Sequence, residues 1–325
     1  MNTPTGTTRL LWLGLGALLL VTLATWLAAR SAPAARTERL HCALPAQPAN
    51  APHPGMVWVP AGSFEMGDTV YAEEQPRRAV SVEGFWMDRT EVSNAEFARF
   101  VAATGHVTTA EREVDAATHP GLPPELRRPG AVVFISPAKV QGRDDANQWW
   151  RYVAGASWRH PGGPGTDIKG RDSFPVVAIS HADVQAYARW KGRQLPTEAQ
   201  WEWAARGARA APMPAHEQPR EANTWQGPFP VLNSGEDGFI GLAPVGCYAP
   251  NALGLYDLIG NVWELTADPY TTATGQARQR VIKGGSFLCA PNYCMRYRAG
   301  ARQPQDEDLA ASHLGFRTIL LAPGP

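Results

Sequence analysis

Apolar and polar positions along the chain predict short elements of mixed type. The stretches MVWVPAG (56–62) and AVSVEGFWMD (79–88) contain short alternating apolar runs, which is typical of strands. Between such stretches the chain is interrupted by many Gly and Pro residues. We therefore expect an α+β fold that is rich in loops, with little regular secondary structure.

Helices are predicted where a capping signal precedes apolar residues at helical spacing. Each begins at a Ser or Thr that is followed by Glu, Asp or Gln three residues later, and each ends near a glycine. The predicted ranges are Ser93 to Gly105, Ser180 to Gly192 and Thr197 to Gly207.

The N-terminus differs from the rest of the chain. Residues 10–29 form an apolar run without a charge, long enough to span a bilayer as a helix. A cleaved signal segment is the alternative, because small residues follow at Ala32-Pro33-Ala34. We expect a membrane anchor with an extracytoplasmic (periplasmic) domain, and a cytoplasmic orientation remains open because Arg residues flank both ends of the run.

The pattern divides the chain into four parts. Residues 1–9 flank the apolar run 10–29, and residues 30–54 are rich in Ala and Pro and read as an extended linker. Residues 55–325 then form one continuous domain, because no second linker interrupts them.

Composition narrows the functional classes. The chain has 325 residues with 30 basic and 30 acidic side chains, so its net charge of zero gives no reason to expect a nucleic-acid partner. Its 31 Gly, 29 Pro and 12 Trp residues indicate many turns pinned by aromatic packing. No HExxH spacing or phosphate-binding glycine loop appears.

Cysteines offer the first candidate chemistry. Cys289 and Cys294 lie close in sequence, whereas Cys42 falls in the predicted linker and Cys247 stands alone. Spacing favours a disulfide between Cys289 and Cys294, and it leaves a reactive or copper-binding pair and a zinc site open. Nearby arginines, Arg296 among them, would lower a thiol pKa if they lie close.

Two polar stretches, 223–241 and 256–270, carry carboxylate and amide oxygens beside Gly-rich turns. Hard oxygens on irregular backbone suit calcium. On these residues alone, a solvated surface turn is the simpler interpretation of both stretches.

Several motifs of the chain resemble those of the formylglycine-generating enzyme family, also called sulfatase-modifying factor. MVWVPAG, LPTEAQWEWA, GNVWE and LGFR are shared across the wider superfamily and indicate the fold. GASWRHPGGP, NSGEDGF and GGSFLCAPNYCMRYRAGAR are narrower and point to the enzyme itself. The resemblance covers residues 56–317 and implies a C-type-lectin-like α+β domain.

The resemblance implies an activity. The family oxidises a cysteine of an unfolded or nascent sulfatase, within a Cys-x-Pro-x-Arg segment, to Cα-formylglycine, using O2, a thiol reductant and copper. Its Cu(I) ligands correspond to Cys289 and Cys294, which act in catalysis together with Ser286. A substrate thiolate would join the two ligands before O2 reacts. A monomer is expected.

The resemblance also implies substrate and calcium sites. The substrate-binding positions correspond to Trp158, Pro161, Trp263, Tyr293, Arg302 and His313. One structural Ca2+ site would use Asn223 and Asp237 with the carbonyls of Thr224 and Phe239. A second would use Asp257 and Glu264 with the carbonyls of Gly260 and Val262.

Several positions depart from the family pattern. Ala188, Ala205, Ala299 and Thr318 stand where eukaryotic members have two disulfides. His313 and Ala310 replace an Asn and a Ser that face the pocket, and His181 stands where a Trp is common. We expect His313 to titrate near neutral pH. These changes keep two alternatives open, which are a non-catalytic binding or assembly protein on the same fold and a superfamily oxidase with another substrate.

Overall fold

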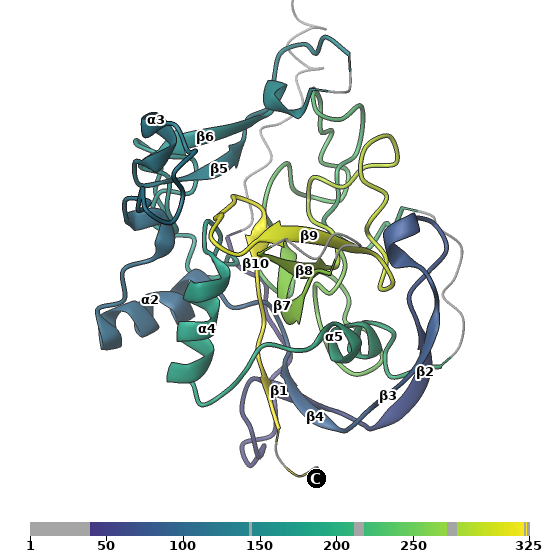
Figure 1. Cartoon of the computed structure of the whole chain (residues 1–325). Helices are drawn as coiled ribbons and strands as arrows, with labels where there is room; N and C mark the ends of the chain where they lie inside the picture. Colours follow the sequence, from purple (N-terminus) through teal and green to yellow (C-terminus); the bar gives the residue numbers. More distant parts are fainter. Residues whose placement is uncertain (1–39, 143–144, 211–217, 272–277, 322, 324–325) are drawn as a thin grey trace, which may run out of the picture. The chain divides into compact units, whose positions relative to one another are not determined.

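Strands β1 and β4 pair antiparallel where alternation predicts strands, with Val59 opposite Phe85. They belong to a computed structural model that describes residues 40–142, 145–210, 218–271, 278–321 and 323. Within these residues short helices and several small sheets are joined by long loops (Figure 1). The expected loop-rich α+β class is confirmed.

The helices and strands are short. The strands are β1 (Met56–Val59), β2 (Gly62–Met66), β3 (Arg78–Val82), β4 (Phe85–Asp88), β5 (Gly130–Phe134), β6 (Trp150–Ala154), β7 (Trp263–Pro269), β8 (Gln279–Lys283), β9 (Arg302–Asp306), β10 (Leu314–Gly315) and β11 (Ile319–Leu320). The helices are α2 (Asn94–Thr104), α3 (Pro124–Arg127), α4 (His181–Trp190) and α5 (Glu198–Ala205), with 3-10 turns η1 (Ala72–Glu74), η2 (Thr109–Glu111) and η3 (Ala146–Gln148).

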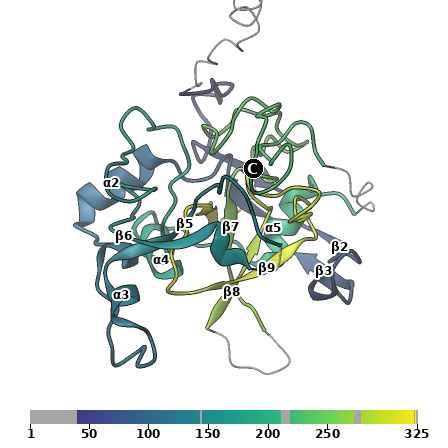
Figure 2. The same cartoon turned by 90° about the horizontal axis from the view of Figure 1, so that it is seen from above.

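Strand β9 is an outer strand of the largest sheet among the described residues. A four-stranded sheet runs β10-β7-β8-β9, and a three-stranded sheet runs β1-β4-β11. The remaining strands form the hairpins β2-β3 and β5-β6. Figure 2 shows the two hairpins on opposite sides of the sheet that contains β7, β8 and β9.

The three predicted helices are confirmed at both ends. Ser93, Ser180 and Thr197 are the N-caps of α2, α4 and α5, and each side chain accepts a hydrogen bond from the third helical N–H. Gly105 ends α2 in a left-handed conformation with φ of 67°, which a residue without a Cβ adopts easily.

Aromatic packing fills the interior, as the Trp content indicates. Phe97, Tyr187 and Trp263 belong to a cluster that also contains both cysteines of the 284–302 loop. A second cluster surrounds Trp201 and Trp203 of α5, and it includes Val59, Phe85 and Ile319 of the three-stranded sheet. The cysteine loop is therefore anchored on the core of the domain.

The N-terminal part of the described chain is fastened to the domain. Cys42 forms a disulfide with Cys247, and Leu44 lies so close to Gly246 that a Cβ at Gly246 would come within 2.3 Å of it. Residues 40–54 contain no helix or strand, as a linker would, but their attachment corrects the view that Cys42 and Cys247 are unrelated.

The membrane prediction is corrected as well. In the part of the chain that the structure describes, no helix is long and apolar enough to cross a bilayer. The apolar run 10–29 lies outside the described residues, so we withdraw the transmembrane helix as a feature of this structure.

Candidate active site

A cavity of about 340 Å³ opens beside the cysteine loop and the central sheet. Six predicted site residues meet there, coming from the cysteine loop, from β7 and from the residue just before β10. They are Ser286, Cys289, Cys294, Tyr293, Trp263 and His313. The structure thus brings together most of the site that the resemblance implies.

Two consecutive turns place the cysteines next to each other. Cys289 N donates to Ser286 O at 2.9 Å, and Cys294 N donates to Ala290 O at 3.0 Å. The two cysteine Cα atoms are consequently 4.6 Å apart, and both side chains are buried. The loop begins at Gly285, whose φ of 76° and approach to Arg296 O leave no room for a Cβ.

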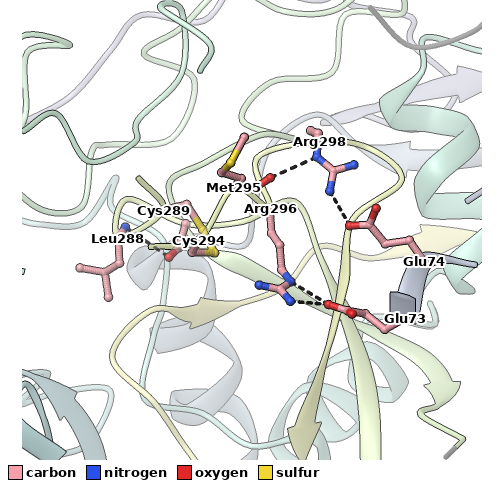
Figure 3. Close-up of a disulfide and its surroundings, with 9 residues drawn as sticks. Glu73, Glu74, Leu288, Cys289, Cys294, Met295, Arg296 and Arg298 are labelled. Atoms are coloured by element: carbon pink, nitrogen blue, oxygen red, sulfur yellow. Dashed lines mark hydrogen bonds and ion pairs between the residues drawn. A yellow bond between two sulfur atoms is a disulfide. The ribbon is translucent and has the colours of Figure 1, made fainter. Parts of the chain in front are cut away.

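The structure joins Cys289 and Cys294 as a disulfide, which is the arrangement that spacing favours (Figure 3). After reduction, two buried sulfurs on neighbouring turns form a soft donor pair that suits Cu(I). Zinc normally takes four protein ligands, and no group of three or more His, Cys, Asp or Glu side chains among the described residues is arranged to hold a metal. The donor pair therefore fits copper better than zinc, and copper remains a prediction.

One aromatic lining residue, Tyr293, is held by rings outside the lining of the cavity. The Tyr293 ring stacks on Phe229 with centroids 4.0 Å apart, and Phe229 packs edge-on against Trp149. Tyr293 is nevertheless 41% exposed. Aromatic packing thus fixes the ring of Tyr293 while leaving part of the side chain accessible.

His313 contributes a neutral imidazole. Its ring lies 4.6 Å from that of Trp150, and its Nδ1 is buried without a hydrogen-bond partner among the described residues. Burial lowers the pKa of His313 to about 4, because the charged form would lose its hydration. The expectation that His313 titrates near neutral pH is therefore wrong.

Arg296 supplies the charge at the cavity wall. Its Nε donates to Glu73 Oε1 at 3.1 Å, and its Nη2 pairs with the same oxygen (Figure 3). Its guanidinium also lies 3.9 Å from the centre of the Tyr71 ring. Burial opposes the ionised form of Glu73, but hydrogen bonding and the charges of Arg296 and Arg302 hold its pKa below the ordinary value.

Three predicted substrate residues lie outside the lining of this cavity. Trp158 is 3% exposed and packs against Phe97 at 5.3 Å, and Pro161 is half-buried in the loop that follows. Arg302 makes a 2.8 Å ion pair with Glu198. These contacts hold the domain together, and a role in substrate binding remains a prediction for all three residues.

The first predicted calcium site has suitable oxygens. Asn223 Oδ1 is buried without a partner among the described residues. Asp237 accepts hydrogen bonds from Thr224 N and Phe239 N, each at 3.0 Å, which brings the predicted ligand residues together. Burial raises the pKa of Asp237, and a bound cation would oppose that rise. The residues fit Ca2+.

The second predicted calcium site fits less well. Glu264 accepts from Arg317 Nη2 at 2.7 Å and Nε at 2.8 Å, so Arg317 occupies both of its oxygens. Asp257 Oδ1 is buried and has no hydrogen-bond partner among the described residues. The nearby carboxylate of Glu91 likewise has a buried Oε2 without a partner there. Glu264 thus already has a protein partner, and the set of Asp257 and Glu264 with the carbonyls of Gly260 and Val262 stays a prediction.

Sequence reasoning missed part of the cavity lining. Trp150 from β6 and Gln303 and Gln305 from β9 line the same cavity as the cysteines, and no motif singled them out. Gln303 and Gln305 are two residues apart on one strand, so they share a face. Their place in the cavity depends on the tertiary structure, which brings β9 to the same cavity as the cysteine loop, so no local sequence pattern indicates it.

Comparisons with known proteins identify a family. The family model of the sulfatase-modifying factor enzyme 1-like domain matches residues 42–322. A formylglycine-generating enzyme of Mycobacterium tuberculosis is 45% identical, over 81% of this chain and 97% of that protein. A mouse protein named an inactive C-alpha-formylglycine-generating enzyme 2 is 39% identical, over 85% of this chain and 89% of its own length.

A solved structure supports the fold. The structure of PvdO from Pseudomonas aeruginosa matches with a TM-score of 0.54 at 23% identity, covering 81% of this chain and 93% of that one. At this identity the likeness concerns the fold alone. With the family model spanning nearly all of the described residues, the chain belongs to the sulfatase-modifying factor enzyme 1-like family.

Proposed function

We propose that this protein oxidises a cysteine in a Cys-x-Pro-x-Arg segment of a sulfatase polypeptide to Cα-formylglycine, with O2 as oxidant and a thiol as reductant. The observation that carries the proposal is the buried pair Cys289 and Cys294 at the wall of a cavity that also contains Ser286 and His313. A relative that bears the name of this activity is 45% identical to the chain over 81% of the chain's length.

Cys289 and Cys294, once reduced, would hold Cu(I) as thiolates. The chemistry that copper supplies when bound is the activation of O2 for oxidation of the substrate cysteine. The chain's own residues prepare the place for it. Trp263 and Leu288 exclude water from the sulfurs, and Ser286, 0% exposed, fixes the loop because its Oγ accepts from Leu288 N at 3.3 Å.

The experiment combines conversion with metal binding. Purified protein is incubated with Cu(I), a thiol reductant, O2 and a Cys-x-Pro-x-Arg peptide, and the peptide mass is followed. The expected result is a mass loss that corresponds to replacement of CH2SH by CHO. In parallel, competition with a Cu(I)-specific chelator measures copper affinity.

Matched variants complete the test. Cys289→Ser and Cys294→Ser should each abolish conversion and weaken Cu(I) binding, because a hydroxyl is a poor ligand for a soft ion. An unchanged peptide in the presence of tightly bound copper would contradict the oxidation. That result would favour a non-catalytic binding protein on the same fold; one mouse relative is named as inactive.

A further inference from the structure

The cavity lining contains both apolar and polar side chains. Val132, Trp150, Leu288 and Leu309 are apolar, whereas Ser286, Tyr293, Arg296, Gln303, Gln305 and His313 are polar. Gln303 and Gln305 come from β9, and Arg296 comes from the cysteine loop. An extended peptide that enters this cavity loses water from its main-chain N–H and C=O groups, and the apolar side chains offer them no partner.

Two of these polar side chains, Arg296 and Gln305, already have hydrogen-bond partners. Arg296 donates from Nε and Nη2 to Glu73. Gln305 Nε2 donates to Leu309 O at 2.8 Å, which closes the turn after β9. The Gln303 amide, by contrast, has no hydrogen bond to another described residue, although the side chain is half-buried and lines the cavity.

Strand β9 cannot receive a peptide through its backbone alone. It is the outer strand of the sheet, next to β8, but Pro304 in its middle has no N–H to donate. A peptide laid along this edge would find an incomplete ladder. A side-chain amide one residue away can replace the missing donor and also supplies an acceptor.

We propose that Gln303 binds the main chain of the substrate peptide beside the residue that is oxidised. Its Oε1 accepts from a peptide N–H, and its Nε2 donates to a peptide C=O. Because every residue except proline offers these two groups, the contact holds an unfolded segment largely irrespective of its side chains. This inference rests on the proposed function, since it takes a peptide as the occupant of the cavity.

The test measures binding without turnover. A peptide in which Ser replaces the reacting Cys is titrated against wild type, Gln303→Ala and Gln279→Ala. Gln279 is the matched control, because its amide lies in the same sheet and bonds Asp306 at 2.7 Å outside the cavity lining. Loss of two neutral hydrogen bonds should weaken binding about tenfold in Gln303→Ala, whereas Gln279→Ala should stay within about twofold.

A series of N-methylated peptides identifies the contact. Methylation of the peptide nitrogen whose N–H donates to Gln303 Oε1 should lower the affinity of the peptide about tenfold for wild type. For Gln303→Ala the same methylation should lower the affinity less than about twofold. If Gln303→Ala does not fold, Gln303→Met keeps the length of the side chain without the amide and serves in its place. Equal affinities, or equal penalties for methylation in both proteins, would overturn the assignment.

The outcomes separate this inference from the proposed function. Conversion of the Cys peptide by wild type together with unchanged binding by the Gln303 variants contradicts Gln303 alone. Binding with the expected methylation pattern but no conversion supports Gln303 and contradicts the oxidation. A wild-type protein that neither binds nor converts the peptide overturns both.

Discussion

Arg296 faces the cavity of the cysteine pair while two of its nitrogens bind a single oxygen of Glu73. Glu73 lies in η1, far away in sequence, and Asp68 and Glu74 bind Arg298 in a similar way. The acidic segment around η1 therefore balances the positive charge that the cysteine loop brings to the cavity.

The first prediction concerns this balance. Glu73→Gln keeps a hydrogen-bond acceptor for Arg296 but removes the negative charge, so the guanidinium acts on the reduced sulfurs uncompensated. A nearby cation stabilises thiolates. We expect the reduction potential of the Cys289–Cys294 pair to rise by about 30 mV, measured by equilibration in glutathione buffers followed by alkylation.

A second ion pair gives the control for that measurement. Glu111→Gln removes a carboxylate that forms a 2.7 Å ion pair with Arg159, and neither residue lines the cavity. This variant should leave the reduction potential of the cysteine pair unchanged. A potential that falls in Glu73→Gln, or moves equally in both variants, would show that Glu73 does not set the charge at the sulfurs.

The second prediction concerns His313. Its pKa of about 4 in the folded protein lies below the value of about 6.5 expected in the unfolded chain. The unfolded state therefore takes up the proton first, so stability that is complete above about pH 6.5 is lost as the pH falls towards 4. In His313→Asn this loss should shrink by about 3 kcal/mol at pH 4, as urea titrations at several pH values would show.

The same variant tests the role of His313 in turnover. Because the imidazole stays neutral above pH 6, the shape of the pH–rate profile between pH 6.5 and 8 should be the same in His313→Asn and wild type. A shoulder near pH 7 that disappears in His313→Asn would mean that the site is wetter than its burial indicates.

The third prediction concerns metal removal at Asn223 and Asp237. If Ca2+ binds there, saturation at a hundred times Kd adds about 2.7 kcal/mol to the free energy of unfolding, and EDTA removes this gain. Asn223→Ala, which deletes the unpartnered buried oxygen, should abolish the response to Ca2+. Asn223→Asp keeps an oxygen ligand and should retain it. An equal response to EDTA in Asn223→Ala and wild type would place the ion elsewhere.

Local signals predicted a large part of the fold. Capping residues such as Ser93 and Thr197 fix where helices begin through contacts within one turn, so the sequence is sufficient to find them. The cysteine pair was equally local, because two successive turns bring Cys289 and Cys294 together.

Long-range contacts account for what the sequence could not predict. Glu73 reaches Arg296 across 223 positions, and Arg317 takes up Glu264 across 53. No spacing rule links such partners. Glu264 shows the consequence, since its own motif gives no sign that Arg317 donates to both of its oxygens.

The last prediction compares the two disulfides. The Cys42–Cys247 bond joins residues 205 positions apart, whereas Cys289 and Cys294 are five apart. If a disulfide stabilises by restricting the unfolded chain, the long loop is worth roughly 5 kcal/mol and the short one roughly 2 kcal/mol. Urea unfolding of Cys42→Ser and Cys294→Ser under oxidising conditions should show this order. Cys294 is buried in the aromatic core, whereas Cys42 is only half-buried, so Cys294→Ser also disturbs packing. Equal losses of unfolding free energy in the two variants would therefore mean that packing of the cysteine loop outweighs chain entropy.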